Sequence, residues 1–144
     1  MRTLIVAIAS SAAVIAVAGA FAADVSPGLW EFTMETRVPS EPGFAPAPFQ
    51  MTQCLSAQDA REPGRLLAQI ANPGATGCDY ADRKYSGNSF SFTLQCAGAY
   101  GIASRGQVSF TSDTMDGNID ATANVGGSRV EMQNRISARR IGAC

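Results

Sequence analysis

Apolar and polar residues alternate strictly along residues 27–36. Every second side chain is apolar and those between them are polar: Trp30, Phe32 and Met34 against Glu31, Thr33 and Glu35. A period of two is typical of a strand with one buried face. We therefore predict a half-buried strand here, with Trp30, the only tryptophan of the chain, on its buried side.

Strand-like runs of the same kind fill the second half of the chain. Short turn signals separate them, as in an antiparallel meander, at 78–85, 89–97, 103–111, 115–125 and 128–141. With residues 49–55 and the opening strand, they predict a mainly β protein: a curved antiparallel meander or a small barrel of about seven strands. In-strand glycines such as Gly106 and Gly117 are expected to supply bulges or bends.

One short helical insertion is predicted between the second and third strands. Ser56 followed by Asp59 has the spacing of a capping box, in which each side chain bonds the other residue's backbone N–H. Pro63 interrupts the segment, so we expect a short turn to Glu62 and a second helical piece at 65–71. The inward residues of that piece would be Leu66, Leu67 and Ile70.

The N-terminus has the features of a secretory signal peptide. Arg2 precedes an uncharged run from residue 4 to residue 18, and Ala20-Phe21-Ala22 supplies small residues ahead of a cut. A membrane-spanning helix needs about 20 apolar residues, whereas this run is diluted by Ala and Ser. We therefore expect a signal peptide at 1–22, one domain at 23–144 with no stable membrane span, and a periplasmic or secreted location.

All four cysteines lie in the part expected to be exported: Cys54, Cys78, Cys96 and Cys144. An even number in an oxidising compartment predicts two disulfides, for which three pairings are open. We favour Cys54 with Cys78 and Cys96 with Cys144. The first bond would close the irregular middle segment, and the second would tie the last residue to a strand. The paired C-x2-C spacing of zinc sites does not occur in the sequence.

Charge and residue types narrow the classes of function. Without Arg2 the 11 basic residues become 10 against 12 acidic ones, so no positive field attracts nucleic acid. Histidine is absent from the sequence, which removes the commonest general base and most transition-metal sites. We therefore expect no enzyme, no cofactor and no metal. Asp116, Asn118 and Asp120, with Asp113 nearby, alternate as the solvated face of a strand does.

A curved sheet with many inward aromatic and methionine side chains suggests a binding function. Asn134 has inward parity between Met132 and Ile136, where it would either be a satisfied core amide or orient a ligand. Our first hypothesis is an exported, non-catalytic binding module for a small apolar or amphipathic ligand. Its candidate ligand-binding residues are Trp30, Phe32, Phe90, Phe92, Phe110, Met115, Met132 and Asn134.

The alternative hypothesis is a structural or interaction protein of the cell envelope with a solid core. Its partner surface would be residues 39–48, here named the Pro-rich loop, which contains four prolines in ten residues and cannot form a regular ladder. Phe44 within this loop would either contact the partner or tuck onto the sheet. Neither hypothesis identifies the ligand or the partner.

The signal peptide, both ends of the mature chain and its cysteine steps together resemble a known family. The segments concerned are Pro27-Gly28-Leu29-Trp30-Glu31, Cys54-Leu55, Cys78, Ser86-Gly87, Gln95-Cys96 and Arg139-Arg140-Ile141-Gly142-Ala143-Cys144. They resemble the DUF3617 family of small exported bacterial proteins of unknown function. The resemblance implies a periplasmic or secreted protein and supplies no catalytic residues.

A second resemblance is to lipocalin-like and related calycin barrels. In these barrels a G-x-W near the start of the first strand packs its indole under an arginine from the end of the last strand. The resemblance implies that Trp30 and Arg140 form such a structural pair, since Arg140 shares the inward parity of Ala138. The alternative is that Trp30 is simply the largest core residue.

Overall fold

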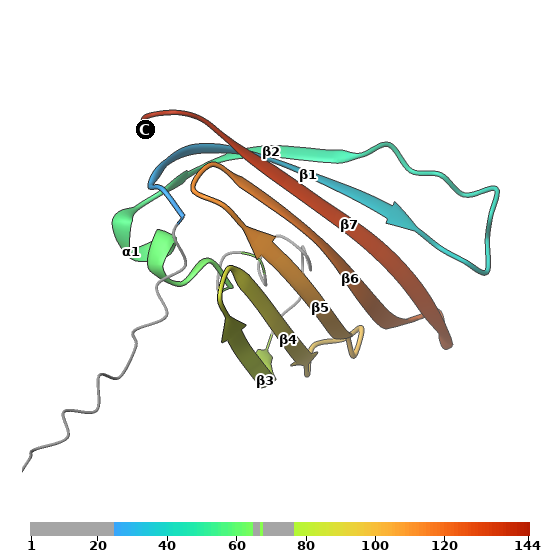
Figure 1. Ribbon diagram of the computed structural model, residues 1–144. Helices are drawn as coiled ribbons and strands as arrows, with labels where there is room; N and C mark the ends of the chain where they lie inside the picture. The colour runs from blue at the N-terminus through green and yellow to red at the C-terminus, as the bar shows by residue number, and fades with distance from the viewer. Residues whose placement is uncertain (1–24, 65–66, 68–76) are drawn as a thin grey trace, which may run out of the picture.

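The computed structural model describes residues 25–64, 67 and 77–144, and it contains one open, seven-stranded antiparallel sheet (Figure 1). Its elements are β1 (Gly28–Arg37), β2 (Phe49–Leu55), α1 (Ala57–Arg61), β3 (Cys78–Ser86), β4 (Ser89–Cys96), β5 (Ala103–Phe110), β6 (Thr114–Val125) and β7 (Ser128–Gly142). The predicted antiparallel meander is therefore confirmed. The barrel alternative is wrong, because β2 and β3 lie at opposite ends of the sheet and do not pair with each other.

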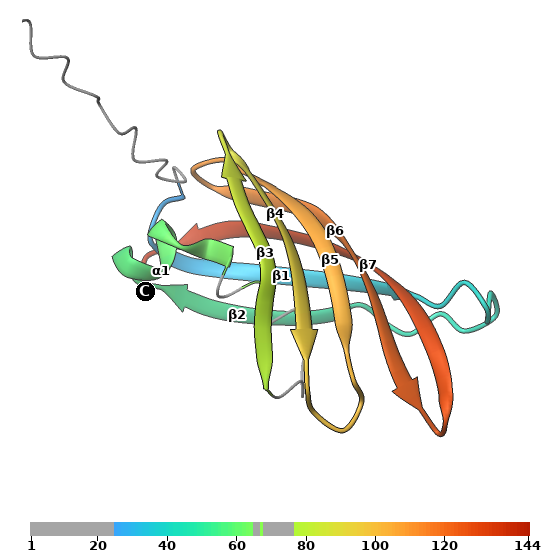
Figure 2. The same ribbon diagram turned by 90° about the horizontal axis from the view of Figure 1, so that it is seen from below.

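The sheet joins the first strand of the domain to the last. Strands β3 to β7 follow one another as a meander, β1 adds to the outer side of β7, and β2 adds to β1, giving the order β2-β1-β7-β6-β5-β4-β3. The sheet is strongly curved and twisted: seen from below in Figure 2, β3, β4 and β5 run across β1 and β2. The concave side of this curve is the inner face of the protein.

The hydrophobic core lies on that inner face, as the alternation of the sequence predicts. Along β1 the inward residues Trp30, Phe32 and Met34 are 0%, 1% and 9% exposed. The other strands repeat the pattern with Phe90, Phe92, Leu94, Val108, Phe110, Met115, Ile119 and Ile136, all of them buried. The core is thus one continuous layer across the sheet.

In-strand glycines bring neighbouring strands into close contact, and the bulges predicted at them are wrong. The β5–β6 register runs without a shift through Gly106 and Gly117. A Cβ atom on Gly117 would lie 2.6 Å from a Val108 methyl group, so the inward side chains of β5 occupy the space that this glycine leaves. The register shifts instead between Tyr80 and Asp82 and between Leu29 and Trp30.

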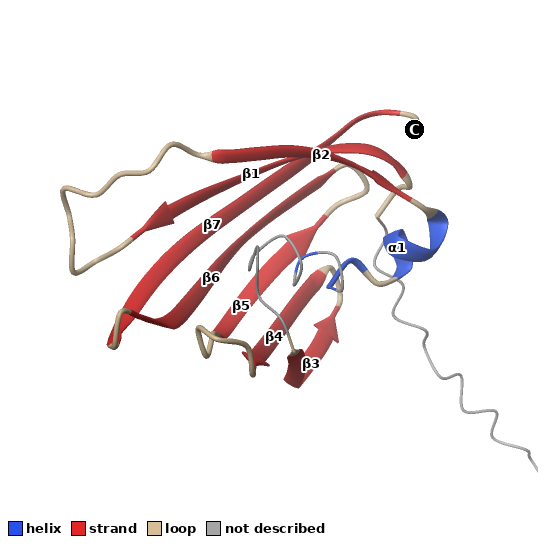
Figure 3. Ribbon diagram, turned by 180° about the vertical axis from the view of Figure 1, so that it is seen from behind, coloured by secondary structure: helices blue, strands red, loops and turns tan. Residues whose placement is uncertain are grey.

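The helical insertion begins with the predicted capping box. The backbone N–H of Asp59 donates to the Ser56 hydroxyl, and the backbone N–H of Ser56 donates to the Asp59 carboxylate. α1 lies at one end of the sheet, beside the end of β2 (Figure 3). Leu67 is fully buried, as predicted. Most of the second helical piece, including Leu66 and Ile70, and the signal peptide at 1–22 lie outside the described residues.

The disulfides differ from the favoured pairing, which is wrong. Cys54 pairs with Cys144, and Cys78 pairs with Cys96. Cys78 and Cys96 are directly opposite in the β3–β4 register. Leu29 of β1 faces Cys54 on one side and Gly142 on the other, so the last residues of the chain reach β2 across the end of β1. The order of the strands in the sheet determines which cysteines meet, and the spacing of the cysteines along the sequence does not reveal that order.

Candidate functional site

The aromatic residues predicted to bind a ligand form the packed centre of the protein. Side chains that line an open cavity expose surface to it, but these expose 3% or less: Trp30, Phe32, Phe90, Phe92 and Phe110. Phe90 and Phe92 stack on each other with ring centroids 5.4 Å apart. The structure thus brings these residues together as core, and ligand binding by them stays a prediction.

A segment of the chain itself covers the β3–β4 part of this layer. Gly64 lies against the Phe90 ring, where a Cβ atom would be only 2.5 Å from two ring carbons. The Tyr80 hydroxyl donates to the Gly64 carbonyl oxygen, and the Gly64 N–H donates to the Tyr85 hydroxyl oxygen at 3.2 Å. The two tyrosines therefore hold the segment after α1 on the inner face.

Burial raises the pKa values of both of these tyrosine hydroxyls. Desolvation, followed by the nearby Tyr85, raises the pKa of Tyr80 to about 12. Desolvation also raises the pKa of Tyr85, against a smaller opposing effect of the hydrogen bond from Gly64. Both hydroxyls are therefore protonated at neutral pH, as the hydrogen bond from Tyr80 requires. Their role here is to anchor a segment.

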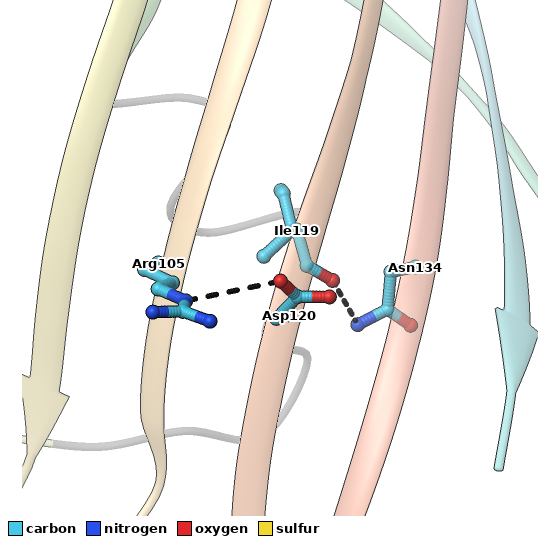
Figure 4. A network of polar contacts seen from close by, with 4 residues as sticks. All are labelled: Arg105, Ile119, Asp120 and Asn134. Carbon is cyan, nitrogen blue, oxygen red and sulfur yellow. Dashed lines mark hydrogen bonds and ion pairs between the residues drawn. The ribbon is translucent and has the colours of Figure 1, made fainter. Parts of the chain in front are cut away.

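Met132 and Asn134 are the predicted ligand-binding residues outside the aromatic layer. Asn134 is 6% exposed, accepts a hydrogen bond from the Thr36 hydroxyl at 2.7 Å and donates one to the Ile119 carbonyl oxygen at 3.4 Å (Figure 4). These bonds make it a satisfied buried amide, one of the two readings of the sequence. Met132 is half-buried beside it on β7.

The outer face of the sheet is polar, as predicted for the Asp-rich strand. Asp116, Asn118 and Asp120 are exposed along β6, and Asp120 forms an exposed ion pair with Arg105 at 3.8 Å, also drawn in Figure 4. A groove of about 350 Å³, lined mainly by outward-facing residues, lies over β6, β7 and β1. Its lining residues are Glu35, Arg37, Asn118, Asp120, Gln133, Asn134 and Arg135.

The Pro-rich loop carries an exposed apolar side chain next to a groove. The loop projects beyond the sheet between β1 and β2 (Figure 1), and Phe44 within it is 54% exposed. Two turns shape it, because Glu41 N–H donates to the Val38 carbonyl at 2.9 Å and Phe44 N–H donates to the Glu41 carbonyl at 2.8 Å. Because more than half of the Phe44 side chain is exposed, it is not packed into the core, and its contact with a partner stays a prediction.

A groove of about 490 Å³ separates this loop from the end of β1. Its apolar residues come mainly from the loop: Val38, Pro39, Pro42, Phe44, Ala45, Pro46 and Pro48. Its polar residues are Glu35, Thr36, Arg37, Glu41 and Gln133. Sequence reasoning found the loop but missed Gln133, because only the pairing of Arg37 with Gln133 across β1 and β7 brings that residue to the groove.

Comparison with known proteins places the chain in a family. A family model described as "Protein of unknown function (DUF3617)" matches residues 25–144. The chain belongs to this family. Comparison with curated proteins and with solved structures gave no significant match.

In this DUF3617 protein, the two sequence ends that carried the resemblance meet at one place. Trp30 of β1 and Arg140 of β7 are opposite each other in the register. The Arg140 guanidinium donates from Nε to the Pro27 carbonyl oxygen at 2.9 Å, and Trp30 donates from Nε1 to the Ser26 carbonyl oxygen at 3.0 Å. The two residues are thus neighbours in the β1–β7 register, and the structural pairing of the indole with the guanidinium stays a prediction.

A glycine is required where this DUF3617 protein begins its first strand. Gly28 has a φ of +143°, and a Cβ atom there would lie 2.5 Å from the Gly142 carbonyl oxygen and 2.6 Å from Nε of Arg140. The glycine therefore makes room for the arginine to reach Pro27.

The described part of the chain contains no helix with the length and apolar character of a membrane span.

Proposed function

We propose that this DUF3617 protein is an exported, non-catalytic interaction protein that binds a protein of the cell envelope through its Pro-rich loop. The observation that carries the proposal is the exposed loop with Phe44 beside a groove of about 490 Å³. The packed inner face supports it, since the buried aromatic layer serves as a solid core. Two disulfides fit export, because such bonds persist in oxidising compartments.

The groove has the composition of a small protein interface. Apolar loop residues make up most of its lining, and Glu35, Arg37 and Glu41 supply its charged groups. Interfaces of this kind bury an apolar side chain of the partner at the centre and keep polar groups at the rim. Proline restricts the unbound backbone, so less conformational entropy is lost when a partner binds. The partner class that fits is a protein presenting an apolar side chain.

The small-ligand hypothesis remains the alternative, with a different binding surface. It assigns the ligand to the inner face, where Trp30 and Phe32 lie, and not to the loop. Binding there requires the core to open, because these two side chains are 0% and 1% exposed. The two hypotheses therefore differ in whether a loop variant or a core variant loses binding.

Site-specific photo-crosslinking in intact cells tests the proposal. A crosslinking amino acid replaces Phe44, Glu41 or Tyr100 in separate variants, and the captured proteins are identified by mass spectrometry. Tyr100 is the matched control, because it is an aromatic residue with 55% exposure in another loop. We expect positions 41 and 44 to capture the same envelope protein and position 100 not to capture it.

Binding of that protein in purified form then gives the quantitative test. Phe44→Ala is expected to weaken the affinity at least about tenfold, the effect of losing a central interface residue, and Tyr100→Ala to change it less than about twofold. Unchanged binding after replacement of the Pro-rich loop by Gly and Ser would contradict the proposal. Native mass spectrometry showing a co-purified apolar molecule, retained by Phe44→Ala, would favour the ligand hypothesis instead.

A further inference from the structure

The two edges of the open sheet are protected very differently. Edge strands expose unpaired backbone groups and invite pairing with another chain, so proteins usually guard them with charges and bulges. The β3 edge has both kinds of protection. Its register shifts between Tyr80 and Asp82, and four charged residues lie along it: Asp79, Asp82, Arg83 and Lys84.

The β2 edge carries neither of these protections. Its seven residues, Phe49 to Leu55, include no charge and no proline, and its register with β1 runs without a shift. Phe49 is 46% exposed, and Gln50 and Thr52 are exposed on the outer face of the sheet. Within the described residues, no strand pairs with the edge of β2 that faces away from β1. The edge is therefore suited to accepting one more antiparallel strand.

The sequence of β2 is complementary to itself. A two-fold axis through Thr52, perpendicular to the sheet, would place Phe49 opposite Leu55 and Met51 opposite Gln53 of the second copy. All four of these residues have the inward parity of β2, because their β1 partners are the inward residues. Thr52 would face Thr52, a favourable cross-strand pair, and the strand brings no like charges together.

We propose that β2 is a self-association edge, at which a second copy of this chain adds antiparallel to form a continuous sheet of two domains. The closed two-fold arrangement consumes both β2 edges and leaves only the guarded β3 edges free. This inference does not rest on the proposed function, since it uses the strand and not the Pro-rich loop. An extended segment of another protein is the competing occupant.

Charge exchange at the two-fold position tests the proposal. Mature protein is examined by analytical ultracentrifugation up to about 1 mM, the weakest affinity that counts as association here. The wild type is expected to approach twice the monomer mass. Thr52→Lys and Thr52→Glu should each remain monomeric, because like charges would face each other, and an equimolar mixture should dimerise again. The matched control is Asn118→Lys on the interior strand β6, which should dimerise as the wild type does.

Each other result overturns the proposal. A wild type that stays monomeric at about 1 mM has no self-association edge. A dimer that persists in Thr52→Lys uses another surface, and a mixture of the two charge variants that stays monomeric excludes the axis at Thr52. Capture at β2 of an extended peptide by a monomeric wild type assigns the edge to a different partner. Circular dichroism of each variant establishes that it is folded.

Discussion

Arg140 of the last strand donates a hydrogen bond to the carbonyl oxygen of Pro27, which lies three residues before Trp30, the register partner of Arg140 on β1. This bond fixes the segment that leads into β1. Two further bonds act on the same segment: Trp30 Nε1 donates to the Ser26 carbonyl oxygen, and the Ser26 N–H donates to the Ser112 carbonyl oxygen at 2.9 Å. Hydrogen bonds to backbone carbonyl oxygens therefore hold the start of β1 against β7 at this end of the open sheet.

Replacing Arg140 should weaken this closure more than replacing its neighbour. Arg140→Met keeps the apolar stem but leaves Pro27 without its charged donor, so we expect a loss of about 1 to 2 kcal/mol in the free energy of unfolding. Arg139→Met is the control. It removes an exposed ion pair with Glu31 at 2.9 Å, which should contribute about 0 to 1 kcal/mol. Urea unfolding measures both, and equal losses would show that Arg140 contributes no more than a surface charge.

The disulfide pairing can be checked by peptide mapping under non-reducing conditions. We expect one linked peptide pair containing Cys54 and Cys144, and another containing Cys78 and Cys96. Any Cys54 to Cys78 peptide would contradict the fold, because β2 and β3 are at opposite ends of the sheet.

The two disulfides should also differ in their contribution to stability. They link residues 90 and 18 positions apart. In the loop-entropy model these separations correspond to about 4.5 and about 3 kcal/mol. Double Cys→Ser variants at each pair, compared by urea unfolding, should therefore show the larger loss for the Cys54 to Cys144 bond. The reverse order would mean that β3–β4 geometry, and not loop closure, dominates.

The alternation of apolar and polar residues was enough to predict most of the strands, because it can be recognised from residues adjacent in the sequence. The predicted run at 49–55 matches β2, and the Ser56 capping box is present. Strand neighbours were not predictable in the same way. That β1 adds to β7 determines where Cys144 lies and brings Gln133 to the groove of the Pro-rich loop. Both depend on pairings between residues about a hundred positions apart, which periodicity does not record.

Trp30 separates the core interpretation from the ligand interpretation. Trp30→Ala removes a fully buried aromatic side chain and should cost about 3 to 5 kcal/mol of unfolding free energy. Trp30→Phe should cost less, because it keeps most of the ring but loses the hydrogen bond to Ser26. Circular dichroism follows unfolding in both. If Trp30→Ala keeps full stability while a co-purified ligand is lost, Trp30 belongs to a binding site and not to the core.

Stability should fall in alkaline solution through the tyrosines that hold Gly64. The pKa of Tyr80 is about 12 in the folded protein against 10.0 for the free side chain, so the folded state binds this proton more tightly. Its contribution is therefore complete below pH 10 and is lost as the pH rises toward 12, because the unfolded chain releases the proton first. Urea unfolding from about pH 8 to about pH 11 should show a steeper decline for the wild type than for Tyr80→Phe. Tyr100→Phe, which alters an exposed tyrosine, should follow the wild type. Equal slopes for the wild type and Tyr80→Phe would mean that the Tyr80 hydroxyl is not buried against Gly64.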